Sequence, residues 1–102
     1  MAMVYARVHH YTKGYGVREI YTMRAQSLLK LRANIVFRME HPGRYYPGLD
    51  PDALSFDVSG NNPGTVMRKN KRIVWIDRNG AYHGIRSDGS IGPAYTSDEW
   101  YR

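Results

Sequence analysis

The run Ile73-Val74-Trp75-Ile76 and the turn signals around it constrain the fold of this chain more than any other stretch. Consecutive β-branched and aromatic residues are typical of a central strand that is covered on both faces. Asn79-Gly80 follows almost at once and Asp88-Gly89 comes soon after, and both dipeptides favour tight hairpin turns. Asn70-Lys71 is a weaker turn signal ahead of the strand. Residues 65–95 are therefore predicted to form an antiparallel β-meander.

Two-residue loops at these turns would fix the strand register. Lys69 is then expected opposite Arg72, Trp75 opposite Gly84, and Tyr82 opposite Tyr95. Since directly opposed residues share a face, the meander has two faces, and the second is either another half of the core or a stacking platform. The predicted core face carries Met67, Val74, Ile76, His83, Ile85 and Ala94. The second face carries Val66, Arg68, Ile73, Trp75, Tyr82, Arg86, Ile91 and Tyr95.

The first forty residues predict a strand followed by a helix. Alternation over residues 3–9 indicates a half-buried strand, and residues 17–23 are either a second strand or the beginning of the helix. Apolar residues at helical spacing predict an amphipathic helix with Thr22 as its N-cap. Arg32 interrupts the apolar arc and is expected to reach solvent at its margin. The helix is expected through Ala33, and residues 35–39 either continue it or form a separate strand.

The middle of the chain is rich in turn residues. Pro-Gly pairs at 42–43, 47–48 and 63–64 predict a long loop over residues 41–64. We therefore predict one α+β domain over residues 1–102, with an antiparallel meander of about three to five strands packed against one amphipathic helix. Its parts are an N-terminal strand or hairpin with the helix (1–40), the Pro/Gly-rich loop (41–64) and the C-terminal meander (65–102).

The charge of the chain is segregated along the sequence. The 102 residues carry a net charge of +6, and the segments 1–40 and 65–87 each carry +5. The segments 41–64 and 88–102 each carry −2. Two basic blocks favour a phosphate-attracting patch on the folded protein. Nine tyrosines against two phenylalanines suit a half-buried surface that contacts a partner.

Several functional classes lack support in the sequence. The chain contains no cysteine, so it has no disulfide and no thiolate metal ligand. His9 and His10 point to opposite faces of a strand, and no histidine spacing is that of a zinc site, so we expect no metal and no other cofactor. No apolar run is long enough to cross a membrane, and residues 1–10 lack the apolar stretch of a signal peptide. We therefore expect a cytoplasmic location and no membrane partner.

The basic end of the meander is the predicted binding site. Cations there would contact phosphates, and rings on the second face would stack on bases. The favoured function is a small, basic, non-enzymatic binding module for single-stranded nucleic acid or RNA. The predicted binding residues are Arg68, Lys69, Lys71, Arg72, Trp75, Tyr82, Arg86 and Tyr95.

Two other functions use the same surface. The first is a protein-binding accessory, such as a phage-encoded inhibitor of a host enzyme, since Tyr, Trp and Arg dominate protein interfaces. The second is a metal-independent ribonuclease, because a strand, a helix and a basic meander resemble in topology and charge the small RelE-like messenger-cleaving toxins. Acid–base and phosphate-binding roles would then fall to Tyr82, His83, Arg86 and Tyr95.

Overall fold

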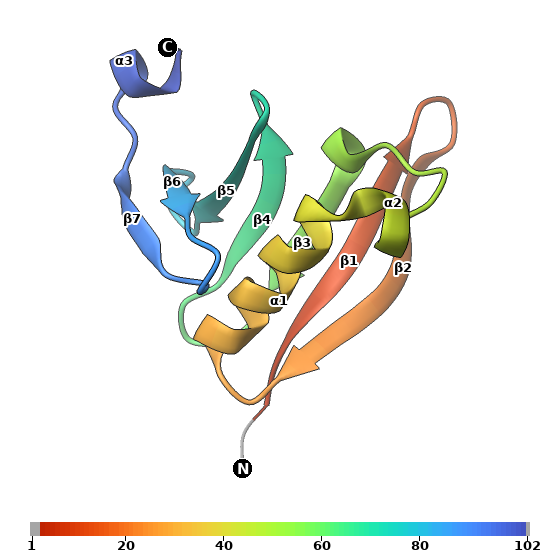
Figure 1. The fold of residues 1–102 in the computed structure, drawn as a ribbon, viewed down its shortest axis with the longest axis horizontal. Coiled ribbons are helices and arrows are strands. Elements are labelled where there is room, and N and C mark those ends of the chain that lie inside the picture. The colour runs from red at the N-terminus through yellow and green to blue at the C-terminus, as the bar shows by residue number, and fades with distance from the viewer. Residues whose placement is uncertain (1–2, 102) are drawn as a thin grey trace.

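A computed structural model describes residues 3–101 of the chain as one sheet with one main helix (Figure 1). The helices are α1 (Leu28–Glu40), α2 (Pro42–Tyr45) and α3 (Ser97–Trp100), with a short 3₁₀ turn η1 (Pro51–Ala53). The strands are β1 (Val4–Thr12), β2 (Gly16–Ala25), β3 (Leu54–Val58), β4 (Gly64–Lys69), β5 (Arg72–Asp77), β6 (Tyr82–Ile85) and β7 (Ile91–Ala94).

All strands belong to one antiparallel sheet. Its seven strands lie in the order β2-β1-β3-β4-β5-β6-β7, and α1 lies across one face of it (Figure 1). The α+β class with one main helix is therefore confirmed, but the sheet has more strands than the predicted three to five. The difference arises because β3 pairs with β1 on one side and with β4 on the other, which joins the N-terminal hairpin to the meander.

Residues 41–64 are not a loop throughout. They contain α2, η1 and the strand β3, in which Leu54, Phe56 and Val58 are buried. This short alternating strand lies between clusters of turn residues, which masked its period of two. The helix differs from prediction as well. β2 runs on to Ala25, so the N-cap is Ser27 and not Thr22, and α1 continues without a break through residues 35–39.

The core lies between α1 and the face of the sheet that carries Trp75. Leu31, Ile35 and Met39 of the helix pack in one cluster with Val8, Phe56, Val66 and Trp75 of the strands. The assignment of the two faces of the meander was therefore wrong, because α1 covers the face that holds Val66 and Trp75. Arg32 was also misplaced, since it is buried in this layer. Its Nε donates to the carbonyl of Gly89 (2.7 Å), and its guanidinium lies 5.0 Å from the centre of the Trp75 ring.

The first hairpin of the meander has the predicted register, and the second does not. Lys69 pairs with Arg72 across a turn in which Asn70 and Lys71 both have positive φ. In the next hairpin Trp75 pairs with His83 and not with Gly84. The β5–β6 loop is longer by one residue than predicted, because the Asp77 carboxylate accepts from the amides of Asn79 (2.9 Å) and Ala81 (3.0 Å). A one-residue slip moves every side chain of β6 to the opposite face.

The face of the sheet that α1 does not cover is called the open face here. Along β1 and β3, buried residues that point to the α1 side alternate with residues that point to the open face. Their cross-strand partners in β2 and in β4–β6 lie on the open face as well. Tyr82 pairs with Ile76 and Gly84 pairs with Val74, so these four residues all lie on the open face. Among residues 3–101, no helix is long and apolar enough to cross a membrane.

Candidate binding surface on the open face

Three rows of side chains run across the open face. The first row joins Arg7, Asp57, Thr65, Ile76 and Tyr82 through successive cross-strand pairs. At the usual strand spacing such a row of five strands spans about 19 Å, which suits several nucleotides of an extended chain. The middle row carries no Asp, Glu, Lys or Arg side chain. The third row lies beyond it and contains the pair Lys69 and Arg72. Members of the middle row are His9, Ser55, Met67, Val74 and Gly84.

The carboxylate in the first row is already engaged by its neighbours. Asp57 accepts a hydrogen bond from the Thr65 hydroxyl (3.0 Å), and its second oxygen lies 3.1 Å from Nδ1 of His9. Arg7 is exposed on the same row, and no ion pair with a described residue neutralises it. Arg7 can therefore contact an anionic ligand.

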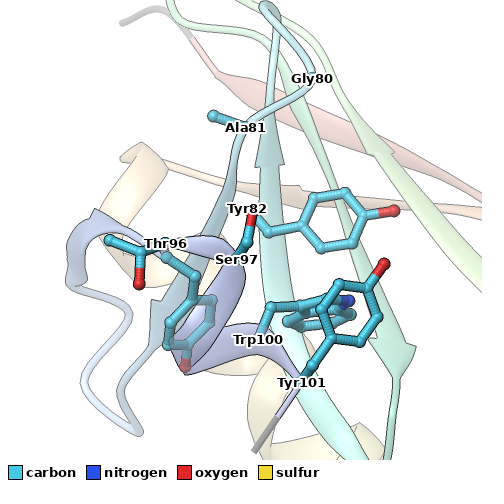
Figure 2. A pocket seen from close by; sticks show the side chains of 8 residues that line it. Gly80, Ala81, Tyr82, Thr96, Ser97, Trp100 and Tyr101 are labelled. Carbon is cyan, nitrogen blue, oxygen red and sulfur yellow. The ribbon is translucent and has the colours of Figure 1, made fainter.

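Aromatic rings gather where β6, β7 and α3 meet. The Tyr82 and Trp100 rings lie edge to face with centroids 4.7 Å apart, and Tyr95 lies 5.9 Å from Trp100. Figure 2 shows Tyr82, Trp100 and Tyr101 around a surface hollow of about 340 Å³. Tyr95 also lines it, and Gly80, Ala81, Thr96 and Ser97 complete the lining. A hollow bounded by rings on one side and small residues on the other suits a planar group.

The β4–β5 hairpin holds this cluster in place. Asn70 donates from its side chain to the carbonyl of Trp100 (2.9 Å), and Arg72 donates to the carbonyl of Glu99 (3.0 Å). The Arg72 guanidinium also lies 5.5 Å from the Tyr95 ring and 5.6 Å from the Trp100 ring. Because Thr96 and Glu99 form a capping box, α3 has a fixed start above the sheet. Cation and rings therefore lie side by side on this part of the open face.

A second hollow lies between Lys69 of β4 and Tyr11 of β1. It has a volume of about 470 Å³ and shares the open face through Tyr11, Met67 and Lys69. Tyr11 is 53% exposed, so its ring is accessible to a ligand. Asp50 and Asp52 also line this hollow. The carboxylate of Asp52 pairs with Arg68 (3.2 Å), and Lys69 forms no ion pair with any residue that the structure describes.

Five of the predicted binding residues lie on the open face, and three do not. Lys69, Arg72, Tyr82 and Tyr95 are brought together there. Arg86 lines a hollow beside them with Gly84 and Tyr95, and it donates to the Ser90 hydroxyl (3.3 Å). Arg68 lies on the face covered by α1, and Lys71 forms the turn. Trp75 has no exposed surface, so its assignment as a stacking residue was wrong.

Other rings and cations of this surface were not among the predicted binding residues. Tyr5, Arg7 and Tyr11 belong to β1, and the alternation over residues 3–9 already placed the first two on one side of that strand. The signal that could have found them is this alternation, once β1 is known to share the sheet with the meander. Trp100 packs onto the body of the protein through Tyr82 and Tyr95.

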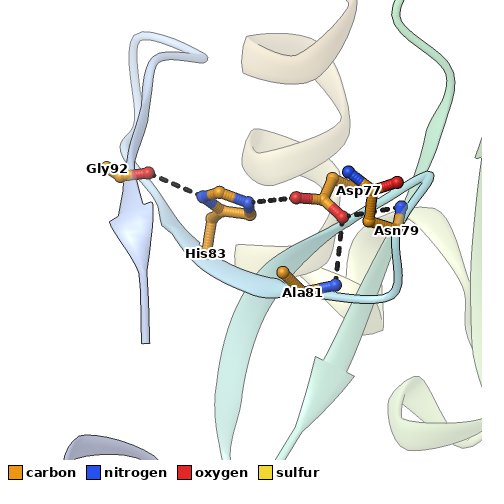
Figure 3. Close-up of polar contacts among 5 residues, drawn as sticks. All are labelled: Asp77, Asn79, Ala81, His83 and Gly92. Atoms are coloured by element: carbon orange, nitrogen blue, oxygen red, sulfur yellow. Dashed lines mark hydrogen bonds and ion pairs between the residues drawn. The ribbon is translucent and has the colours of Figure 1, made fainter. Parts of the chain in front are cut away.

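His83 lies on the α1 side of the sheet and bridges two strands (Figure 3). Its Nε2 lies 2.7 Å from Oδ2 of Asp77, and its Nδ1 lies 2.8 Å from the carbonyl oxygen of Gly92. Both partners only accept hydrogen bonds, so the geometry fits an imidazolium that donates from both nitrogens. The hydrogen bond to Asp77 raises the pKa of His83, and the same bond lowers the pKa of Asp77.

The ribonuclease constellation is not assembled. Tyr82 and Tyr95 are on the open face, whereas His83 is on the opposite side with both ring nitrogens engaged. A general acid or base must reach the same substrate atoms as its partners. Nor do residues 3–101 contain a group of three or more His, Cys, Asp or Glu side chains that could hold a metal ion.

Neither a protein family, nor a curated protein, nor a solved structure matches the chain. The fold and the surface therefore define the class of this protein by themselves. It is an α+β protein with one helix-covered face and one open face, and the open face carries aromatic and basic side chains.

Proposed function

We propose that the protein binds single-stranded nucleic acid, or RNA with unpaired bases, on the open face of its sheet. One observation carries the proposal: tyrosines and cations share one sheet face that no long helix covers. Rings on such a surface stack on bases of any sequence, and cations between them contact the backbone. We also propose a cytoplasmic location, where messenger and other unpaired RNA is at hand.

The rings of the open face would stack on bases, and its cations would contact phosphates. Tyr5, at 38% exposure, and Tyr11 offer accessible rings on β1, and Tyr82, Tyr95 and Trp100 offer a ring cluster at the opposite side. Arg7 lies between the two tyrosines of β1, and Lys69 and Arg72 lie on β4 and β5 between the two groups of rings. These three cations would contact phosphates. Because duplex bases are already stacked, this arrangement favours single strands over duplexes.

Fluorescence anisotropy with labelled oligo(dT), oligo(rU) and a matched duplex tests the proposal. We expect both single strands to bind, the duplex to bind more weakly, and Tyr11→Leu to weaken single-strand binding roughly five- to tenfold by loss of one stacked base. Tyr15→Leu is the matched control, since Tyr15 is 90% exposed in the β1–β2 turn. If neither single strand binds, or both substitutions act equally, the proposal is wrong.

A protein target is the second candidate, and the hollow beside Trp100 favours it. Tyr82, Tyr95 and Trp100 are half-buried rings with Arg72 beside them, and this combination is typical of interface hot spots. A protein that acts this way would bind its partner with or without added RNA, and the same oligonucleotides would show no affinity.

A further inference from the structure

Arg38 of α1 is held in place by a chain of contacts that begins in the core. Tyr46 is buried beside Phe56, with ring centroids 6.0 Å apart, and its hydroxyl shares a hydrogen bond with the hydroxyl of Tyr21. Nη1 of Arg38 donates to the same Tyr21 hydroxyl (2.9 Å), and the guanidinium lies 5.7 Å from the centre of the Tyr21 ring. The half-buried Arg38 guanidinium is therefore oriented before any ligand binds.

Tyr45 brings a second cation to the same place. The guanidinium groups of Arg38 and Arg44 each lie 5.3 Å from the centre of the Tyr45 ring. Arg44 is exposed in α2, which follows α1 on the side of the sheet opposite the open face (Figure 1). Neither arginine forms an ion pair with a carboxylate of residues 3–101, although Glu40 lies between them in the sequence. Two positioned guanidinium groups without an acidic partner form a binding site for an anion.

Phe37 adds an apolar side chain beside the two arginines. It is 49% exposed on α1. Its ring centroid lies 4.6 Å from that of His41 and 6.0 Å from that of Tyr45, which it meets edge to face. The surface formed by Phe37, Arg38, Arg44 and Tyr45 is called the helix patch here. An exposed ring beside two cations suits a ligand that carries both apolar and acidic side chains.

Nucleic acid fits the helix patch less well than a protein segment does. A base stacks on the free face of a ring. In the helix patch both guanidinium groups lie over the Tyr45 ring, and the imidazole of His41 lies against the ring of Phe37. Carboxylates can still pair with the guanidinium groups, and an aliphatic or aromatic side chain can contact the exposed part of Phe37.

We propose that the helix patch is a docking site for an acidic segment of a partner protein, in which Asp or Glu residues flank a large apolar side chain. The carboxylates pair with Arg38 and Arg44, and the apolar side chain packs on Phe37. The charge of the region matches such a partner, because residues 28–45 contain four Lys or Arg and one Glu. The helix patch and the open face lie on opposite sides of the sheet, so this proposal does not depend on nucleic-acid binding.

Fluorescence anisotropy with labelled peptides of about twelve residues tests the chemistry of the partner. The first peptide combines Glu with Leu and a central Phe, the second has Gln in place of Glu, and the third has Ser in place of Leu and Phe. We expect the first peptide to bind with a Kd of about 10–100 µM. Each of the other two should bind at least roughly fivefold more weakly, because each lacks one half of the recognition.

Substitutions locate the binding on the protein. Arg38→Gln and Arg44→Gln should each weaken binding of the first peptide roughly five- to tenfold, and Phe37→Ser should weaken it roughly tenfold. Arg7→Gln on the open face removes the same charge, and Tyr15→Ser removes an exposed ring in the β1–β2 turn. These two controls should bind the peptide within about twofold of the natural chain.

Tyr21→Phe tests the positioning of Arg38 without a change in charge. It removes the hydroxyl that orients the guanidinium and keeps the ring, so we expect roughly threefold weaker peptide binding. Circular dichroism melts verify that each variant folds. If Arg38→Gln unfolds, Arg44→Gln at its exposed position carries the test of the charges.

A first peptide that binds no better than its Gln counterpart overturns the proposal. So does an Arg7→Gln effect as large as those of Arg38→Gln and Arg44→Gln, because general attraction by the net charge of +6 would then explain all three. Displacement of the peptide by oligo(rU) would also overturn it, since the helix patch would then bind nucleic acid. Failure of oligonucleotides to bind the open face leaves the peptide result unchanged.

Discussion

Trp75 has no exposed surface and lies between backbone on one side and a cation on the other. A Cβ added at Gly64 would lie 2.6 Å from Cε2 of its ring, so the indole rests directly on this glycine. The guanidinium of Arg32 lies 5.0 Å from the ring centre. Burial disfavours the charged guanidinium and lowers the pKa of Arg32. The cation–π contact and the bond to Gly89 compensate for part of this desolvation.

At this scale we first predict that Trp75→Ala destabilises the protein by about 3–5 kcal/mol, because it leaves a large cavity in the core. Tyr82→Ala should cost only about 1 kcal/mol, since it removes a half-buried ring and one aromatic pair. Urea denaturation measures both. Equal losses of stability from the two substitutions would contradict the assignment of Trp75 to the core and Tyr82 to the open face.

Two glycines give a second, matched comparison. Ala at Gly64 meets the Trp75 ring and the carbonyl of Ile76 (2.7 Å), neither of which can move freely, so it should cost about 1–3 kcal/mol. Ala at Gly84 meets the Oη of Tyr95 (2.7 Å), the far end of a side chain that can turn away. We expect Gly84→Ala to keep most of the stability but to weaken oligonucleotide binding. The opposite ranking in thermal melts would contradict these packing assignments.

At the scale of elements, the turns decide which residues share a face. The Asn70-Lys71 loop has two residues, and its register was predictable from the sequence alone. The Asp77 carboxylate lengthens the next loop, and the resulting slip separates Trp75 from Tyr82 and Tyr95. The amides that a carboxylate will bond are fixed by the folded loop, so dipeptide signals do not contain this information.

Longer-range pairing was equally hard to predict. β3 completes the sheet, but its three buried residues are recognisable as a strand only when its partners β1 and β4 are known. The choice of which face α1 covers depends on those same partners. The predicted pairing of Tyr82 with Tyr95 nevertheless agrees with the structure, in which the Tyr95 amide donates to the Tyr82 carbonyl (2.7 Å).

The stability that His83 gives by joining Asp77 of β5 to Gly92 of β7 should depend on pH. The raised pKa of His83, caused first by its hydrogen bond to Asp77, means that its stabilisation is complete below about pH 6.5 and is lost as pH rises through that raised pKa. The lowered pKa of Asp77 means that its contribution holds above about pH 3.8 and is lost as pH falls through the lowered value. Both contributions are therefore complete between these two values.

We predict that His83→Gln removes most of the loss of stability between about pH 5.5 and 8.5, because Gln does not titrate. Urea denaturation at several pH values measures it. His41→Gln is the control, since His41 is exposed at the end of α1. A pH dependence that is the same in the natural chain and in His83→Gln would show that the Asp77–His83 pair is not its source.

At the scale of the whole molecule, the proposed function assigns folding and binding to different faces of the sheet. One face is used by α1 to form the core, and the other keeps rings and cations accessible. The net charge of +6 attracts a polyanion to the protein, and the open face combines cations with adjacent rings across several strands. Binding and stability should therefore be separable by substitution.

The most direct test is the salt dependence of oligo(dT) binding. If about three phosphates are contacted, the slope of log K against log salt should be about −2, or a roughly 20-fold loss between about 50 and 200 mM salt. Arg7→Ala with Lys69→Ala should make the slope shallower by about 1.4, whereas Lys30→Ala with Arg44→Ala on the other side should leave it unchanged. Affinity that is indifferent to salt, or equal slopes for the two double variants, would contradict binding on the open face.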